Sequence, residues 1–240
     1  GDKENMIDKV EKNIYLDKQA HEYRLLDEPD FSFTSVTTLI GNHFEEFDPL
    51  AVATNLVENN IKYMGRSVDE LIKEWKQTGV YGTFVHEEIE NYIKEGIAPG
   101  EPKSLAGVNW LEGYKMKSDI EIIPERIIYS RELKIAGTID VLAYDRVKDH
   151  YEIIDWKTSK AVETVPYKGK MGISAHTSNI PDCRFYHYAL QLSLYRYILE
   201  ECYGIKINNQ LIAHLKQDGA RGYVAPYMRD TIIDIISNNN

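Results

Sequence analysis

Two aspartates and a lysine in the second half of the chain combine residue types and spacing that suit a chemical reaction. Asp155 and Lys157 form a D-x-K triplet at the end of an apolar run, and Asp140 lies within the preceding run. Carboxylate oxygens are the ligands that Mg²⁺ and Mn²⁺ prefer. A lysine ammonium beside them can position a water molecule or stabilise negative charge that develops during phosphoryl transfer. The alternative is that Asp155 and Lys157 form an ordinary ion pair on an exposed strand.

Three apolar stretches must position these residues. They are rich in Ile, Val and Tyr and are separated by charged turns, which is typical of a meander of three antiparallel strands: Ile120–Tyr129, Leu133–Tyr144 and Tyr151–Trp156. Side chains alternate between the faces of a strand, so Lys157 shares the face of Asp155. An acid at the end of an apolar strand is costly unless its charge is compensated.

The turns between the strands fix which acids face one another. If the turns are Arg131–Lys134 and Arg146–Asp149, antiparallel pairing places Asp140 opposite Asp155 and Glu125 opposite Asp140. Directly opposed side chains lie about 5 Å apart at Cβ on one face. Three carboxylates in such a row repel one another, which predicts a divalent cation among them.

The rest of the chain reads as a mainly helical first half, residues 35–117, and a mixed second half. The remaining predicted elements are short strands at Asn13–Leu16 and Glu22–Leu26, helices at Val68–Gln77, Val80–Glu95 and Leu105–Lys117, a helix at Phe185–Tyr203, and strands at Ile207–Leu215 and Tyr223–Tyr227 around a turn at Gln217–Gly222. Gly96 and Gly204 follow two of the helices, as expected at helix C-termini. This order predicts an α/β or α+β fold, a central mixed sheet flanked by helices.

Composition bounds the class of protein. The chain has 240 residues, 43% hydrophobic and 28% charged, as in ordinary globular proteins. It has no apolar run of the roughly 18 residues that a membrane span needs, and its polar first residues do not resemble a secretory signal, so we expect an intracellular protein. Cys183 and Cys202 are too few for an iron–sulfur cluster or a four-cysteine zinc site. We expect both to be free thiols.

The formal net charge of −10 argues against a generic nucleic-acid coat protein, which would have a basic face. It does not exclude an enzyme that acts on nucleic acid, because metal-binding carboxylates add negative charge that a bound cation reverses locally. Basic residues do gather immediately after the third strand, where only two acids oppose them. They are Lys157, Lys160, Lys168, Lys170 and Arg184.

Four segments together resemble a known enzyme family. Gly137–Asp140 (GTID) and Ile154–Ser159 (IDWKTS) are similar to the core of the PD-(D/E)XK nucleases. Gly82–Glu90 (GTFVHEEIE) and Gln191–Tyr195 (QLSLY) match the G-T-x-x-H-x-x-x-E and Q-x-x-x-Y helices of its RecB-like exonuclease branch, which includes the mitochondrial genome maintenance exonucleases. Ile139 replaces the proline of the family name. Each motif alone is weak, and their order and spacing carry the resemblance.

This resemblance covers about residues 80–215. It implies a restriction-endonuclease-like core at 80–240, preceded by a mainly helical N-terminal extension at 1–79. It also implies Mg²⁺- or Mn²⁺-dependent hydrolysis of DNA, from an end and on single strands, in repair, recombination or replication. We expect a monomer that works with a helicase or other replication and recombination proteins. The alternatives are an RNA-cutting nuclease and a non-catalytic nucleic-acid-binding module that retains the fold.

The resemblance assigns further residues to the site. Asp140, Asp155 and Lys157 are the expected catalytic residues; the expected metal ligands are His86, Asp140, Asp155 and the Trp156 carbonyl, with Glu125 or Glu90 assisting. His86 and Glu90 are one helical turn apart, and their alternative role is a surface pair. Gln191 and Tyr195 are expected at the nucleic acid. Their alternative role is in the core, because Tyr188, Leu192 and Tyr195 form an apolar stripe.

Two loop segments have open interpretations. The connection at Ala161–Arg184 is long for a compact domain, so it is either functional or a mobile surface loop. Lys168, Lys170 and Arg184 of this connection, and Lys160 directly before it, are expected to contact phosphates, while Tyr167 stacks on a base. Ser35–Thr38 (SVTT) is expected to cap a helix rather than to bind phosphate.

Overall fold

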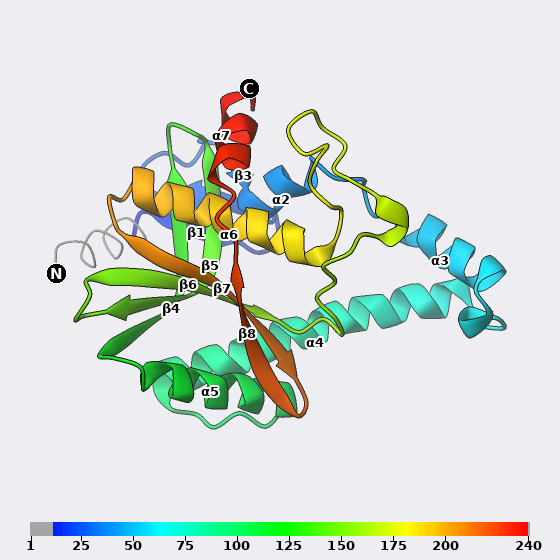
Figure 1. Ribbon diagram of the computed structural model, residues 1–240, viewed down its shortest axis with the longest axis horizontal. Helices are drawn as coiled ribbons and strands as arrows, with labels where there is room; N and C mark the ends of the chain where they lie inside the picture. The colour runs from blue at the N-terminus through cyan, green and yellow to red at the C-terminus, as the bar shows by residue number, and fades with distance from the viewer. Residues whose placement is uncertain (1–11, 240) are drawn as a thin grey trace.

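The computed structural model describes residues 12–239 of the chain. Most of the polar N-terminal stretch, in which no secretory signal is expected, lies outside these residues. A mixed six-stranded sheet forms the centre of the fold, with helices on both faces (Figure 1). Its strands are β3 (Thr34–Ser35), β4 (Ile120–Ser130), β5 (Ile135–Asp145), β6 (His150–Lys157), β7 (Ile207–Lys216) and β8 (Gly219–Ala225). The predicted α/β class is confirmed.

Helices account for most of the remaining chain, and a separate antiparallel hairpin precedes the sheet. The helices are α2 (Val36–Gly41), α3 (Pro49–Asn59), α4 (Val68–Glu95), α5 (Pro102–Lys115), α6 (Arg184–Glu201) and α7 (Arg229–Ser237), with short 3₁₀ turns η1 (Ile61–Tyr63) and η2 (Tyr167–Gly169). The hairpin consists of β1 (Ile14–Asp17) and β2 (Glu22–Leu25).

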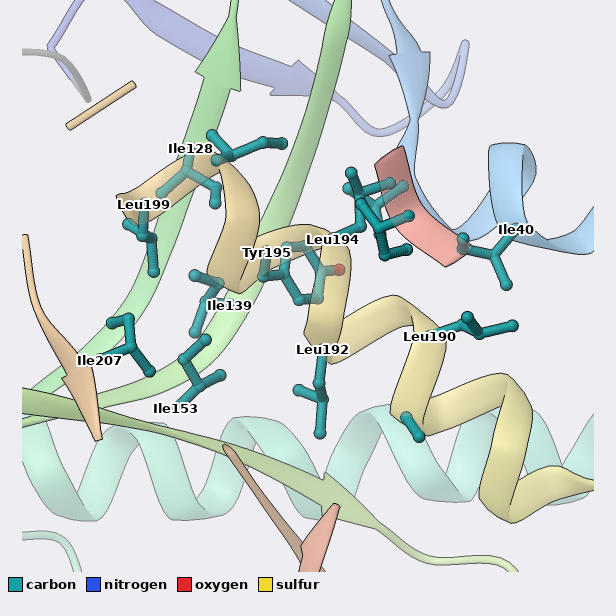
Figure 2. Close-up of a cluster of buried hydrophobic side chains, with 14 of the residues drawn as sticks. Ile40, Ile128, Ile139, Ile153, Leu190, Leu192, Leu194, Tyr195, Leu199 and Ile207 are labelled. Carbon is teal, nitrogen blue, oxygen red and sulfur yellow. The ribbon is translucent and has the colours of Figure 1, made fainter. Parts of the chain in front are cut away.

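Two hydrophobic cores lie on opposite faces of the sheet. The larger one joins α2, α6 and α7 to the sheet, and Figure 2 shows α6 side chains such as Leu192, Tyr195 and Leu199 beside Ile139 and Ile153 of the strands. The smaller one joins α4 and α5 to the other face. In Figure 1, α3 and the first turns of α4 extend away from the sheet, whereas the second half of α4 runs beneath it.

The register of the meander is as predicted on both sides of β5. The turns are Arg131–Lys134 and Arg146–Asp149, since β4 ends at Ser130 and β6 begins at His150. Val141 pairs with Ile154, and the same register continued by one residue places Asp140 opposite Asp155. β7 then adds to β6 in parallel, with Asp155 beside Ile212.

Several predicted boundaries need correction. The two helices expected at Val68–Gln77 and Val80–Glu95 are one helix, α4, which continues through Gly79 because a single glycine weakens a helix without ending it. Ser67 caps its start and Gly96, with φ of 71°, ends it. The domain boundary predicted after residue 79 therefore falls inside a continuous helix.

Two further corrections concern the C-terminal part. The turn expected at Gln217–Gly222 is a tight one at Gln217–Asp218, so that β8 begins at Gly219 and not at Tyr223. Helix α7 was not predicted, although Ile232 and Ile235 bury one face of it against the larger core. Within residues 12–239, no helix combines the length and the apolarity needed to cross a membrane.

Candidate active site

The candidate site lies where β5 has an open edge. β4 pairs with one edge of β5 along its length. The other edge is shared, with β3 at Ile135 and Ala136 and β6 from Val141 onward. Residues 137–140 between them form no ladder pairs on that edge. The sheet therefore forks at this point, and Asp140 lies at the corner of the fork.

Asp140 and Asp155 meet in the fork. Asp140 Oδ2 accepts a hydrogen bond of 2.8 Å from the backbone N–H of Trp156, which replaces a ladder bond between the diverging strands. The two carboxyl groups are within hydrogen-bonding reach of each other. Their side chains are only 21% and 16% exposed. The predicted juxtaposition of these two acids is thus present.

Helix α4 brings His86 to the same place. Its Nε2 lies 2.9 Å from the Trp156 carbonyl oxygen and 3.3 Å from Asp140 Oδ2, and its Nδ1 lies 2.7 Å from the carbonyl oxygen of Gly82. α4 can approach the end of β6 because Gly82 lacks a side chain, since a Cβ there would lie 2.8 Å from Thr158 Oγ1. Gly82, the glycine of the predicted motif, is thus a packing residue.

Lys157 completes the cluster from the face predicted by strand alternation. Its Nζ lies 2.8 Å from Asp155 Oδ2 and 4.2 Å from the centre of the Tyr188 ring, and its side chain is 21% exposed. Trp156, between the two, points to the opposite face, where its ring meets Trp110 of α5 in the smaller core. The end of β6 therefore supplies three groups of the cluster, which are the Asp155 carboxyl group, the Trp156 carbonyl oxygen and the Lys157 ammonium.

Burial and mutual charge shift the pKa values of this cluster. Burial raises the pKa of Asp155 to about 7, with a contribution from Asp140, although Lys157 opposes the shift. Burial also acts to raise the pKa of Asp140, but the hydrogen bond and charge of His86 outweigh it and lower that pKa to about 2. Burial lowers the pKa of His86, yet Asp140 raises it to about 9. The protein alone therefore stabilises one carboxylate well and the second poorly.

The third predicted acid takes a different position. Glu125 is opposite Asp140 in register but does not pair, and its φ of 36° turns the backbone out of the strand conformation. Its carboxyl group forms a hydrogen bond with Glu90 of α4 instead, and Glu90 also forms an ion pair with Lys94. The prediction that Glu125 lies in a row with Asp140 and Asp155 is therefore wrong. The hydrogen bond to Glu90, followed by burial, raises the pKa of Glu125 to about 7.

Glu90 and Glu125 nevertheless line one cavity together with His86 and Asp140, two members of the cluster. The cavity has a volume of about 380 Å³ and is lined by His86, Asp140, Glu90, Glu125 and Tyr195, among others. Part of its wall comes from two segments that the sequence did not assign to the site. They are Leu16, Lys18 and Tyr23 of the β1–β2 hairpin and Ser35, Val36 and Thr37 at the start of α2.

Contacts in the structure explain why these wall residues lie there. Tyr23 forms a hydrogen bond of 2.7 Å between its hydroxyl and Thr138 Oγ1 on the open edge. Ser35 caps α2 by accepting from the backbone N–H of Thr38, as predicted, and lines the cavity as well. No spacing in the sequence linked Tyr23 or Lys18 to the site. Tyr188, which the sequence pattern placed only in an apolar core stripe, also lies beside Lys157 of the cluster.

The Q-x-x-x-Y pair is divided between two cavities. Tyr195 is 7% exposed, lines the cavity beside Asp140, and has a pKa well above its usual value because it is buried. Gln191 faces a neighbouring cavity of about 620 Å³ between α2, α6 and the 161–184 connection, which His187 also lines. Tyr195 thus has the alternative role of a core residue and also borders the candidate site, while its expected contact with nucleic acid stays a prediction.

The 161–184 connection has a defined path. Ile173 N–H and Thr177 Oγ1 both donate to the carbonyl oxygen of His43, and Thr177 is fully buried. Two of the predicted phosphate-binding cations have acidic partners, Lys170 with Glu45 and Arg184 with Glu163, each at 2.8 Å. For Lys160 and Lys168, residues 12–239 offer no such partner; the Lys168 ammonium lies 5.4 Å from the ring centre of Tyr167. Both cysteines are free thiols.

The comparisons with known proteins add little. No protein-family model matches the chain, and no curated protein sequence is similar to it. Among solved structures, the crystal structure of SSO0001 is similar to the chain with a TM-score of 0.38 and 14% identity, covering 98% of this chain and 83% of that one. A similarity of this size carries no information about the site.

Proposed function

We propose that the protein is a Mg²⁺- or Mn²⁺-dependent nuclease that hydrolyses phosphodiester bonds of DNA, as an exonuclease on single-stranded ends. The observation that carries the proposal is the cluster of Asp140, Asp155, Lys157 and His86 at the fork of the sheet. These are the residues that the resemblance to the RecB-like branch of the PD-(D/E)XK nucleases assigns to catalysis and metal binding. Their convergence from α4, β5 and β6 supports that resemblance.

The donor atoms fit a hard divalent cation. In residues 12–239 no three His, Cys, Asp or Glu side chains form a complete metal-binding group. Two carboxylates, the Trp156 carbonyl and His86 Nε2 are nevertheless adjacent, and such oxygen-rich sets suit Mg²⁺ or Mn²⁺. The poorly stabilised anion of Asp155 is a further reason for a cation here. When bound, the ion would neutralise the phosphate and lower the pKa of a water molecule.

The protein's own groups have separable tasks in this scheme. The Nδ1–H of His86 donates to the Gly82 carbonyl, which fixes the ring and leaves Nε2 to act as a ligand once it is deprotonated. Asp140 is oriented by the Trp156 N–H. The Lys157 ammonium would stabilise negative charge on the phosphate oxygens or orient the attacking water.

The shape of the site supports action at a strand end. The cavity beside Asp140, at about 380 Å³, is in the size range of pockets for small molecules and can hold a nucleotide. The β1–β2 hairpin lines one side of it through Leu16, Lys18 and Tyr23. We therefore place the terminal nucleotide in this cavity and the phosphodiester beside Asp140 and Asp155.

Purified protein incubated with end-labelled single- and double-stranded DNA and RNA tests the proposal. Each substrate is tried with Mg²⁺, Mn²⁺ or EDTA, alongside Asp155→Asn, Lys157→Ala and the control Asp218→Asn, which changes an exposed acid in the β7–β8 turn. We expect metal-dependent cleavage of single-stranded DNA, retained in the control and lost in the other two variants.

The other outcomes separate the alternatives. Preference for RNA would reassign the substrate, and metal-dependent binding without cleavage would indicate a non-catalytic module. Cleavage in EDTA, or full activity in both site variants, would overturn the proposal. Cleavage of a circular single strand would contradict action at an end.

A further inference from the structure

The Lys157 ammonium has two neighbours that hold it in place, and only one of them is a carboxylate. Asp155 Oδ2 lies 2.8 Å away, and the ring centre of Tyr188 lies 4.2 Å away on another side. An ammonium this close to an aromatic ring is attracted by the negative face of the ring. Tyr188 is in the first half of α6 and is partly buried against the larger core.

Asp155 and Tyr188 differ in how strongly they attract the ammonium once a cation binds in the site. Asp155 is one of the carboxylates proposed above to bind a divalent ion, and a carboxylate that ligates an ion has less charge left to attract an ammonium. The attraction of an aromatic face does not depend on the charge of Asp155. Lysine has a flexible stem with several rotatable bonds, so an ammonium without a second holder would occupy several positions.

We propose that Tyr188 is a positioning residue, which holds the ammonium of Lys157 over its ring so that Lys157 stays directed at the phosphate while Asp155 serves the metal. This inference rests on the proposed function for the reaction but not for the contact itself. It gives a functional role to a residue that the sequence places in an apolar core stripe.

The fixed surroundings of Tyr188 support this role. The helix that carries it also carries Leu190, Leu192 and Leu194, all buried in the larger core, so the ring is mounted on a rigid element. Lys157 is the last residue of β6 and lies beside His214 of β7. The ammonium is therefore held between two elements whose relative position the core fixes.

The test compares two substitutions at one position. Tyr188→Phe keeps the ring, and Tyr188→Leu removes it but keeps an apolar side chain. Tyr186→Leu is the matched control, because Tyr186 is a partly buried tyrosine on the same helix whose ring lies against Phe185. Thermal unfolding of each variant checks that it folds.

Kinetics on a single-stranded oligonucleotide with Mg²⁺ give the first readout. We expect Tyr188→Leu to lower kcat by about 10-fold, with KM changed by less than about twofold, and Tyr188→Phe to remain within about twofold of the wild type. In a Lys157→Gln background, Tyr188→Leu should cause no further loss, because the tyrosine acts through the lysine. Equal losses for Phe and Leu, or additive losses in the double variant, would overturn the proposal.

A second readout needs no enzyme activity. Acetylation of lysines by an amine-reactive reagent, quantified by mass spectrometry on metal-free protein that carries Asp155→Asn, reports how well the Lys157 amine is held without the charge of Asp155. We expect Lys157 to be modified several-fold faster in Tyr188→Leu than in Tyr188→Phe, with exposed Lys160 as the internal reference. Unchanged labelling would overturn the positioning role. If the wild type cleaves nothing, the proposed function fails while the labelling result still decides this inference.

Discussion

A carboxyl group shielded from water beside a second carboxylate can keep its proton, or it can lose the proton to solvent when a neighbouring cation stabilises the resulting anion. Asp155 is in this situation, with a pKa of about 7 and Lys157 as its permanent cation. A divalent ion between Asp140 and Asp155 would satisfy both acids at once. The same arrangement implies that metal binding and folding stability are linked.

The first prediction concerns this linkage. Because Mg²⁺ would bind the folded state, a concentration of 100 times its Kd should stabilise the protein by about 2.7 kcal/mol, which corresponds to roughly 5–10 °C in Tm for a chain of this size. Differential scanning calorimetry with and without Mg²⁺ measures it. Asp155→Asn should abolish the rise in Tm, and Asp218→Asn should keep it. An equal rise in both variants would place the ion elsewhere.

The second prediction concerns Glu125, whose pKa is raised from an ordinary 4.5 to about 7 by the hydrogen bond with Glu90 and by burial. The folded state thus holds more protons than the unfolded state between these two pH values, so stability falls as pH rises through this window. Glu125→Gln removes the titration. After allowance for solvent screening, the free energy of unfolding of this variant, relative to the wild type, should be about 1 kcal/mol higher at pH 8 than at pH 5.

Urea unfolding at both pH values checks this, with Glu163→Gln as an exposed control. If wild type and Glu125→Gln have the same pH dependence, then Glu125 and Glu90 do not share a proton. The pair could not be foreseen from the sequence, because the strand pattern placed Glu125 beside Asp140. A positive φ at one residue within a strand leaves no periodic signal.

At the scale of elements, the approach of α4 to β6 sets the distance between His86 and the Trp156 carbonyl. Gly82 and Gly79 are both in α4, but only a Cβ at Gly82 would meet another segment, at Thr158 directly after β6. The third prediction is that Gly82→Ala lowers stability by about 1 kcal/mol and, by displacing the end of β6, lowers activity by roughly 10- to 100-fold. Adding Thr158→Ala, which removes the clashing hydroxyl, should restore much of both.

Gly79→Ala is the matched control for this pair. Nothing lies within 4 Å of the added Cβ, so the change should stabilise the helix by about 0.5–1 kcal/mol and leave activity unchanged. Chemical denaturation and cleavage rates measure both effects. A destabilised Gly79→Ala, or a neutral Gly82→Ala, would show that the helix approach does not control the site.

The elements also show how far the sequence leads. The meander turns, and hence the meeting of Asp140 with Asp155, follow from strand alternation and charged turns, both of which are local patterns. The positions of Tyr23 and of the 161–184 connection depend on contacts between residues more than 100 positions apart, such as Tyr23 with Thr138 and Thr177 with His43. Such contacts have no local signature.

At the scale of the whole molecule, a net charge of −10 opposes any approach of nucleic acid. The fourth prediction is that affinity for a single-stranded oligonucleotide depends on the divalent ion. With Ca²⁺ in place of Mg²⁺, to limit cleavage, binding should be at least about 10-fold tighter than in EDTA, because compensating two carboxylates beside a phosphate is worth more than about 1.4 kcal/mol.

Fluorescence anisotropy at fixed ionic strength measures this affinity. Asp140→Asn combined with Asp155→Asn should bind equally well in Ca²⁺ and in EDTA, since both carboxylates proposed to hold the ion are then gone. A Ca²⁺ effect of the same size in that double variant would assign the ion to another surface.

The fork in the sheet also bears on solubility. Backbone groups on an unpaired strand edge can pair with a strand of another molecule, which is a route to aggregation. Here the open edge is limited to residues 137–140, β3 and β6 occupy it on both sides, and Tyr23 is bonded to Thr138 within it. This open edge is too short for a β-strand of another molecule to pair along it. The unpaired edge of β5 at the site is therefore a poor template for a strand of another molecule.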